Sequence, residues 1–234
     1  MSLRSDTKIL KLWPNFIDHY NLNNMGSVMY MKHVEMVVLA NSVKHGGHCV
    51  AGKDIKTKEW VRPVSDKDGS ALSRSQVLCS NPYGKYPAKP LQKIKMNLEQ
   101  HVPKVNQPEN FQVGNSDWRQ NYKLREDDLI NYLDFPQDLW GKGNKVSFNQ
   151  IKRGEVNIIN SLCLVQVEKL NLFICGEGKR RCSFSYNGVM YDFPATDPMF
   201  DTLVNTNSVL AGILCISLGE EFHGYCYKLV ASIY

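Results

Sequence analysis

Polar side chains gather in one short stretch of the chain, Asn41–Gly47, where Asn, Ser, Lys and His stand beside two glycines. Glycines let the backbone approach a ligand closely and expose N–H groups that can bind an anion. Asn41 and Ser42 can donate hydrogen bonds, Lys44 can supply a positive charge, and His45 belongs to the same candidate set. An ordinary polar loop between two strands explains the same composition, so both interpretations stand.

A second candidate group lies on a predicted strand, where Trp60 and Arg62 are two residues apart and so share a face. An aromatic ring and a guanidinium on one face of a barrel can stack bases and contact phosphates. We interpret Trp60 as a core residue and Arg62 as ligand-binding, with Asn110 as a further binding residue. We expect Ser42, Lys44 and Arg62 to converge on one concavity. It should attract an anion if no carboxylate pairs with either cation.

A third candidate is the basic run Lys179, Arg180 and Arg181, which follows a glycine-rich tip, Gly176–Gly178. It lacks the spacing of a nucleotide-binding P-loop. A solvated run of charges is the plain explanation, and a flexible finger for a phosphate backbone is the functional one.

The sequence gives little support for a metal site or a catalytic site. His48 and Cys49 are adjacent on a predicted strand and point to opposite faces, and no second cluster completes a metal site. Asp192, Asp197 and Glu109 could hold a divalent ion if they met, whereas an Asp before proline usually caps a turn or helix. No nucleophile motif is present. The sequence predicts no catalytic residue, metal or cofactor, and it leaves enzymatic activity uncertain but disfavoured.

Short strands must position these residues. Apolar runs rich in β-branched residues predict strands over Val34–Ala40, His48–Ile55 and Glu59–Val64, and alternation predicts a fourth over Leu91–Leu98. Residues 65–90 are loop-like. Around 125–134 the spacing of apolar residues changes to that of a short helix.

The second half repeats this layout. Strands are predicted over Ser161–Val167, Leu170–Cys175, Leu210–Ser217 and Gly224–Ile233. The clearest local signal is Asn187-Gly188 between two strand-like runs, because a type I′ turn needs positive φ at both central residues. This turn places Phe184 opposite Tyr191, and we expect both side chains to be buried.

Composition bounds the class of protein. The chain has 234 residues, of which 43% are hydrophobic and 22% charged, as in globular proteins, and its net charge of +5 is compatible with a polyanionic partner. Seven cysteines without a CxxC pair indicate reduced thiols in a cytoplasmic protein. No apolar run reaches the roughly 18 residues of a membrane span, and the N-terminus does not have the apolar core of a signal peptide.

Several segments together resemble the bacterial dual OB-containing domain family. They are Asn41–Gly52 with Trp60–Ser65, then Gln107–Asn110 with Trp118, and finally Phe184–Asp197 with Lys228–Ala231. The resemblance covers roughly residues 34–234. It implies two tandem OB-like barrels and a role in recognising nucleic acid or a nucleotide-like ligand, without an established reaction. One departure is His48, where the resemblance implies Arg.

These observations predict a mainly β fold of two small OB-like barrels joined by a short helical connector, with an N-terminal extension. The expected bounds are 1–33 for the extension, 34–125 for the first barrel, 126–157 for the connector and 158–234 for the second barrel. The leading function is a non-catalytic module that binds nucleic acid through a polar, mildly basic surface. The alternative is an enzyme or sensor acting on a nucleotide-like small molecule between the barrels, and a third interpretation is a scaffold for a protein partner.

The two leading hypotheses differ in the surface they require. A deep pocket between the barrels, lined by Lys44, Arg62 and Asn110, would favour a small molecule. An open groove lined by exposed aromatic residues with Lys and Arg would favour nucleic acid.

Overall fold

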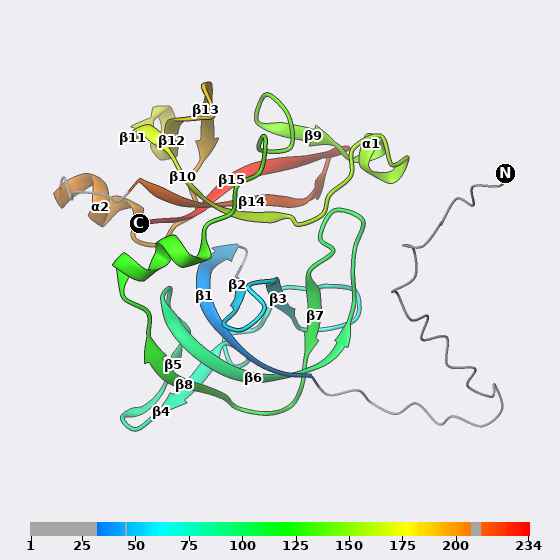
Figure 1. Ribbon diagram of the computed structural model, residues 1–234, viewed down its shortest axis with the longest axis vertical. Coiled ribbons are helices and arrows are strands. Elements are labelled where there is room, and N and C mark those ends of the chain that lie inside the picture. The colour runs from blue at the N-terminus through cyan, green and yellow to red at the C-terminus, as the bar shows by residue number, and fades with distance from the viewer. Residues whose placement is uncertain (1–31, 45, 207–211) are drawn as a thin grey trace, which may run out of the picture.

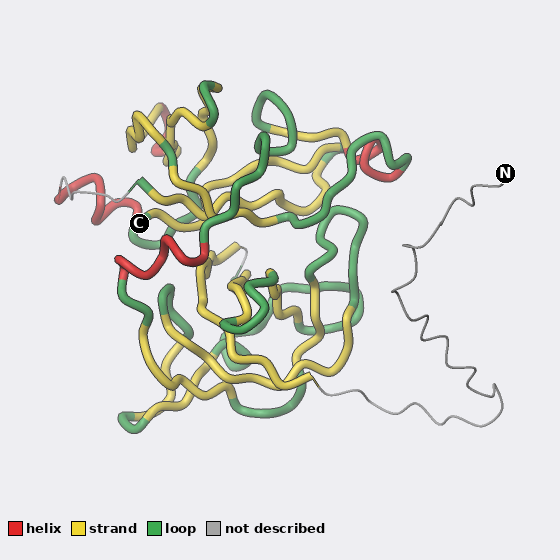
Figure 2. Tube along the Cα trace, in the orientation of Figure 1, coloured by secondary structure: helices red, strands yellow, loops and turns green. Residues whose placement is uncertain are grey.

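The computed structural model describes residues 32–44, 46–206 and 212–234, and it is mainly β, with 54% strand and 11% helix. Two barrel-like units stack on each other, the second above the first in Figure 1, and strands make up most of both units (Figure 2). The predicted fold class is confirmed. Residues 1–31 of the predicted N-terminal extension, and His45, lie outside the described residues, whereas Lys32 and His33 begin the first strand.

The first unit is a closed ring of five strands: β1 (Lys32–Lys44), β2 (Gly47–Asp54), β3 (Trp60–Val64), β6 (Gln92–His101) and β7 (Asn110–Val113). β1 is long enough to pair with β6 through its first half and with β2 through its second half, which closes the ring. Counted along the chain, the strands are ordered one, two, three, five, four, with the third and fifth parallel. This is the five-stranded Greek-key barrel of an OB-fold.

The interior of this barrel is filled by alternate residues of its strands, whose side chains point inward. Met36, Val38, Val50, Ile94 and Leu98 point inward and are almost fully buried. The alternation that predicted the fourth strand is therefore confirmed.

Three further strands extend the sheet of the first unit: β4 (Leu78–Asn81), β5 (Gly84–Pro87) and β8 (Trp118–Lys123). The prediction of a loop over residues 65–90 was wrong where the β4–β5 hairpin lies. β4 and β5 are only four residues long, and Cys79 is the one buried residue in them, so they carry too little alternation to stand out from a loop.

The predicted loop at Asn41–Gly47 was also wrong. β1 continues through Asn41 to Lys44 and pairs with β2, with Ser42 opposite Cys49 and Lys44 opposite Gly47. The strand ladder engages the backbone here, so these residues do not form the expected glycine-rich cradle for an anion. The polar composition reflects a hairpin that extends toward solvent and needs few apolar side chains.

The second unit has the same strand order. Its strands are β10 (Leu162–Gln166), β11 (Glu168–Cys175), β12 (Lys179–Tyr186), β13 (Val189–Pro194), β14 (Ile213–Phe222) and β15 (Tyr225–Ile233). β10 and β11, separated by one residue, together act as the first strand of this barrel, pairing with β14 and β12 respectively. A parallel bridge between Ala195 and Val230 joins the third and fifth strands. Two short helices lie beside the barrel, η2 (Gly176–Gly178) and α2 (Phe200–Thr206).

The hairpin of the second unit matches its prediction in register. Tyr186 pairs with Val189, Phe184 with Tyr191 and Cys182 with Phe193. Phe184 and Tyr191 are 0% and 4% exposed. Asn187 and Gly188 both have positive φ, as the turn requires.

The connector contains a 3₁₀ helix, η1 (Glu126–Tyr132), followed by β9 (Lys145–Ser147) and α1 (Phe148–Lys152). β9 pairs with β15, so this part of the connector joins the sheet of the second unit. We propose to keep 34–125 and 158–234 as the two barrels, with 126–157 between them.

The two units share a hydrophobic interface. Strand residues that point away from each barrel interior meet there, among them Leu39 and Trp60 from the first unit and Leu164 and Cys215 from the second. β1, β10 and β14 are thus buried on both faces, which explains their continuous apolar sequences.

Candidate functional site

A cavity of about 400 Å³ lies at one end of the interface between the two units. Its first wall comes from the ends of β1 and β2 and from β3, including Ser42, His48 and Arg62. Its second wall comes from β14 and β15, including Phe222 and Tyr227. Its size falls within the range of small-molecule sites, and most of its side chains are apolar. We call this cavity the inter-unit pocket.

The position of the pocket follows from how the units pack. In OB-folds the face of strands two and three, with the neighbouring loops, usually binds the ligand. Here Ala51 of β2 and Trp60 of β3 lie in the shared hydrophobic interface, so the second unit covers much of that face. The pocket is where this face stays open, beside the turn between β1 and β2.

Arg62 lines the pocket but does not present a free charge to it. Its Nε donates to Glu109 Oε1 at 2.9 Å, and its Nη2 donates to Ser161 Oγ at 2.8 Å and to Ser217 Oγ at 3.4 Å. Ser161 also donates to Glu109 through its backbone N–H and its hydroxyl. We expected an anion at Arg62 only if no carboxylate pairs with it. Glu109 neutralises the Arg62 guanidinium, so this condition is not met.

The other predicted residues of the first unit lie in different places. Ser42 lines the pocket with Arg62, whereas the Asn41 amide donates to Ala88 O at 2.5 Å and lies outside the lining. Lys44 is described only through its backbone, and His45 lies outside the described residues. The structure thus brings together two of the three side chains expected to converge.

Asn110 lies next to Arg62, since the two residues pair in the parallel ladder of β3 and β7. Its side chain is fully buried, and neither Oδ1 nor Nδ2 has a hydrogen-bond partner among the described residues. Buried polar groups are nearly always paired, so such an amide calls for an explanation.

The basic run begins β12, and each of its cations has a carboxylate partner. Lys179 Nζ lies 2.8 Å from Glu177, Arg180 Nε donates to Asp201 at 2.9 Å, and Arg181 Nε donates to Asp192 at 2.9 Å. None of the three lines the inter-unit pocket. These pairs compensate the charge that a phosphate-binding finger would need.

The three acidic residues considered as metal ligands have separate partners. Glu109 binds Arg62, and Asp192 binds Arg181. Asp197 accepts from the backbone N–H of Met199 at 2.7 Å and of Ile233 at 2.8 Å. Burial raises the pKa of Asp197 while these two bonds oppose that rise. The contact with the Met199 N–H is the one expected of an Asp197 that caps a turn or helix.

Exposed aromatic side chains lie on the β14–β15 hairpin, where Phe222 lines the pocket and Tyr225 is its ladder partner. Phe222 is 58% exposed and Tyr225 37% exposed, and the Nζ of Lys145 lies 3.6 Å from the centre of the Tyr225 ring. Such rings offer flat surfaces on which a planar ligand can stack.

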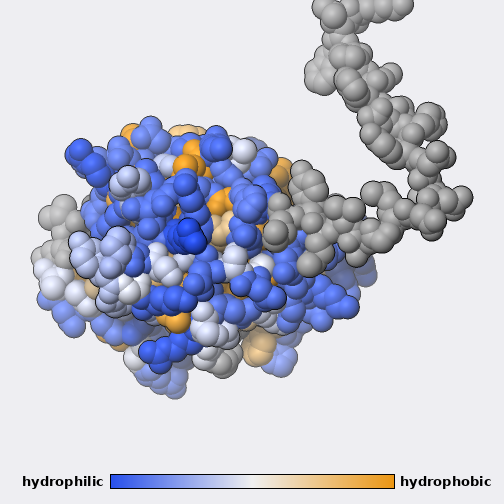
Figure 3. Space-filling view, turned by 90° about the horizontal axis from the view of Figure 1, so that it is seen from below, coloured by the Kyte–Doolittle hydropathy of each residue, from blue (hydrophilic) through white to orange (hydrophobic). Residues whose placement is uncertain are grey.

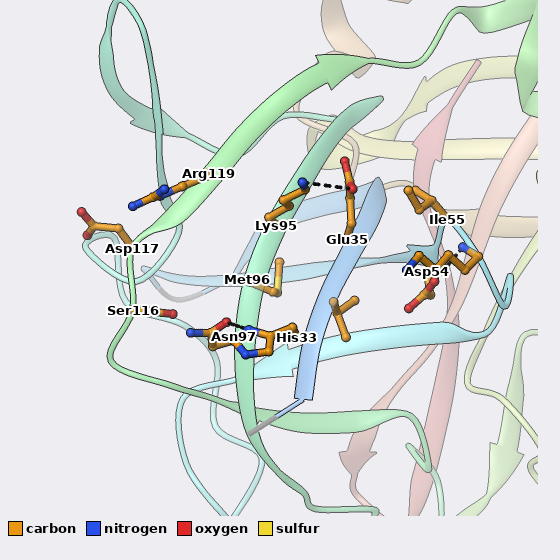
Figure 4. Close-up of a pocket in the computed structure, with 12 residues that line it drawn as sticks. His33, Glu35, Asp54, Ile55, Lys95, Met96, Asn97, Ser116, Asp117 and Arg119 are labelled. Carbon is orange, nitrogen blue, oxygen red and sulfur yellow. Dashed lines mark hydrogen bonds and ion pairs between the residues drawn. The ribbon is translucent and has the colours of Figure 1, made fainter. Parts of the chain in front are cut away.

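A second hollow, of about 500 Å³, lies on the outer surface of the first barrel (Figure 4). Basic and acidic side chains alternate around it, and Lys95 extends toward Glu35 at 3.8 Å. Arg119 and Asp117 stand together at one end of the hollow. On the face of Figure 3, hydrophilic residues predominate and hydrophobic ones are scattered. Side chains of both charge signs line this hollow, together with a few apolar ones.

The pocket contains residues that the sequence analysis did not select, chiefly Gln107, Ser217, Phe222 and Tyr227. Three of these belong to the second unit, and only the packing of the two units brings them to the site. For Glu109, the partner of Arg62, the sequence offers one signal. An arginine within an apolar strand requires a carboxylate, but the sequence does not say which carboxylate that is.

A family profile described as the dual OB-containing domain matches residues 34–233. The chain belongs to the dual OB-containing domain family. This match agrees with the closed five-stranded ring of the first unit and with the curled sheets of the second. A search among curated proteins finds no match. No helix among the described residues of this dual OB domain is long and apolar enough to cross a membrane.

Proposed function

We propose that this dual OB domain is a non-catalytic binding module that holds a nucleotide-like small molecule in the inter-unit pocket. The observation that carries the proposal is the burial of the β2–β3 face beneath the second unit, which leaves a partly open pocket in place of a continuous groove. A pocket of this size favours a small ligand. A long strand of nucleic acid needs a continuous track instead.

The pocket chemistry favours the planar, uncharged part of such a ligand. Val64, Leu229 and Ala231 provide apolar walls, and Phe222 and Tyr227 provide rings. Polar contacts can come from Ser42, His48 and Gln107. A few polar groups on an apolar background are typical of sites that orient a heterocycle.

The test is a binding screen by calorimetry. The four ribonucleosides should bind with little dependence on salt, because the base enters the pocket without a phosphate contact. Ser42→Trp should abolish this binding by filling the pocket. Ser75→Trp, at an exposed serine outside the pocket lining, should bind as the wild type does. Failure of all four nucleosides to bind, or unchanged binding by Ser42→Trp, would contradict the proposal.

Single-stranded nucleic acid is the second candidate, favoured by the exposed rings of the β14–β15 hairpin. A strand with one base in the pocket could stack its next base on Tyr225, beside Lys145. Tyr225→Ala should then weaken binding of a short oligonucleotide by about 1–3 kcal/mol and leave nucleoside binding unchanged. Steep salt dependence of oligonucleotide binding together with no nucleoside binding would favour this candidate.

A further inference from the structure

The buried amide of Asn110 lies on the same side of its sheet as the inter-unit pocket. Asn110 is the ladder partner of Arg62, and paired residues of neighbouring strands point to the same face. The Arg62 side chain lines the pocket. Phe111 and Val113, the neighbours of Asn110 along β7, instead pack with the barrel interior. The amide therefore faces away from the interior and toward the region where the two units meet.

A glycine separates this amide from the pocket. Gly69 lines the pocket and adopts positive φ (+75°). A Cβ at Gly69 would lie 3.1 Å from Asn110 Nδ2 and 3.0 Å from Lys104 Nζ. Two nitrogen donors thus approach the same point beside Gly69, a pocket-lining residue that has no side chain.

Lys104 supplies a charge that Arg62 does not. It lies at the tip of the loop between β6 and β7, which backbone hydrogen bonds between Lys104 and Gln107 hold closed. Within the described ranges, its ammonium group has no ion pair. Asp66, three residues before Gly69, accepts hydrogen bonds from the backbone of Asp68 and Ser70.

We infer that Lys104, Asn110 and Gly69 form a subsite for a phosphate group of the ligand in the inter-unit pocket. The ammonium group neutralises the phosphate, and the Asn110 amide donates to one of its oxygens. Gly69, which has no Cβ, lets both nitrogens approach the edge of the pocket. This inference rests on the proposed function and narrows it from nucleosides to nucleotides. It also gives the unpartnered amide a partner, because a phosphate oxygen accepts the hydrogen bond that Nδ2 otherwise lacks.

The test compares each ribonucleoside with its 5′-monophosphate and with inorganic phosphate, all by calorimetry on the full chain. The monophosphate of the best-bound nucleoside should bind about tenfold or more tightly than the nucleoside itself. Lys104→Gln and Asn110→Leu should each remove this advantage, so that the monophosphate binds no more tightly than the nucleoside does. Lys67→Gln removes an exposed charge two residues from Gly69 and should keep the advantage. Asn110→Leu also removes an unpaired buried amide, so it should retain the fold.

The outcomes separate the two claims. Nucleoside binding with no gain from the phosphate would overturn the subsite and leave the proposed function standing. Phosphate-dependent binding that survives Lys104→Gln would also overturn the subsite. Inorganic phosphate that binds through Lys104 while no nucleoside binds would support the subsite and contradict the pocket as a base site.

Discussion

Arg62 is 8% exposed, and the protein itself satisfies its guanidinium through Glu109, Ser161 and Ser217. Ser161 and Ser217 belong to the second unit, so this arginine joins the two units across their interface. Arginine as a residue type suggested phosphate binding, but here it stabilises the packing of the two units. The first measurement on an Arg62 variant should therefore be its free energy of unfolding.

We expect Arg62→Ala to lower the free energy of unfolding by about 3–5 kcal/mol, because it leaves the Glu109 carboxylate buried without its cation. The double variant Arg62→Met with Glu109→Leu removes both charges and should lose less. Urea unfolding at neutral pH measures both. A loss of less than about 1 kcal/mol in the single variant would mean that Glu109 finds another partner.

Lys228 gives a second prediction at this scale. Its side chain is fully buried and donates to Gly141 O at 2.6 Å and Gly143 O at 2.9 Å, and burial lowers its pKa from 10.5 to about 8. Between these two pH values the unfolded chain binds more protons at this site than the folded chain. The contribution of Lys228 to stability therefore rises as the pH increases from about 8 to 10.5, and it is lowest below pH 8.

Lys228→Met does not titrate, so the difference in unfolding free energy between wild type and variant isolates this effect. That difference should shift in favour of the wild type by about 3 kcal/mol across the window. Taking the difference also removes the opposite trend of the buried cysteines, whose pKa values burial raises. A difference that stays flat with pH would contradict the lowered pKa of Lys228.

At the scale of elements, the Asn187-Gly188 hairpin depends on its turn. Gly188 has φ of +74°, a conformation that residues with a side chain adopt at a cost, so Gly188→Ala should destabilise the protein by about 1–2 kcal/mol. Gly176, also at a hairpin tip, is surrounded by open space and does not have positive φ. Gly176→Ala should leave the thermal midpoint nearly unchanged. Equal losses in the two variants would assign the effect to loop entropy.

The hairpin shows which elements the sequence predicts well. The turn residues and the alternation on each side are local signals, and they specified the pairing of Phe184 with Tyr191 without reference to the rest of the fold. The stretch from Asn41 to Gly47 was mistaken for a loop because its pairing with β2 outweighs its polar composition.

Local signals also decided which residues of the site could be predicted. Ser42 and Arg62 were found because both lie in the first unit, near the predicted turn and strand. Phe222 and Tyr227 reach the pocket only after the two units have packed. The pairing of Arg62 with Glu109 joins residues 47 positions apart, and no local pattern specifies it.

At the scale of the whole molecule, the interface makes one folding unit of two barrels. Asp134 of the connector accepts from Lys53 Nζ at 2.5 Å and Trp60 Nε1 at 3.0 Å, both in the first unit, and from Leu164 N at 2.8 Å in the second. Together with the shared hydrophobic cluster, these bonds couple the stability of each unit to the other.

We therefore expect a single unfolding transition. Amide exchange at Val38 in β1 and Ile216 in β14 should report the same opening free energy. Asp134→Ala should lower both values by about 3–5 kcal/mol, since it leaves Lys53 buried without a carboxylate. Asp127→Ala, which breaks only an exposed pair with Arg125, should change neither by more than about 0.5 kcal/mol. Separate values for the two amides would show that the barrels unfold independently.

The covered face of β2 and β3 has one more consequence. An OB-fold uses that face to bind other molecules, and here the second barrel occupies it as a permanently tethered ligand. The connector keeps the local concentration of that ligand far above any that a free competitor reaches in solution. A molecule that binds this dual OB domain does not displace the second barrel, and it meets only the part of the face that the tethered partner leaves uncovered. Recognition by the first barrel is thus restricted in advance by its own chain.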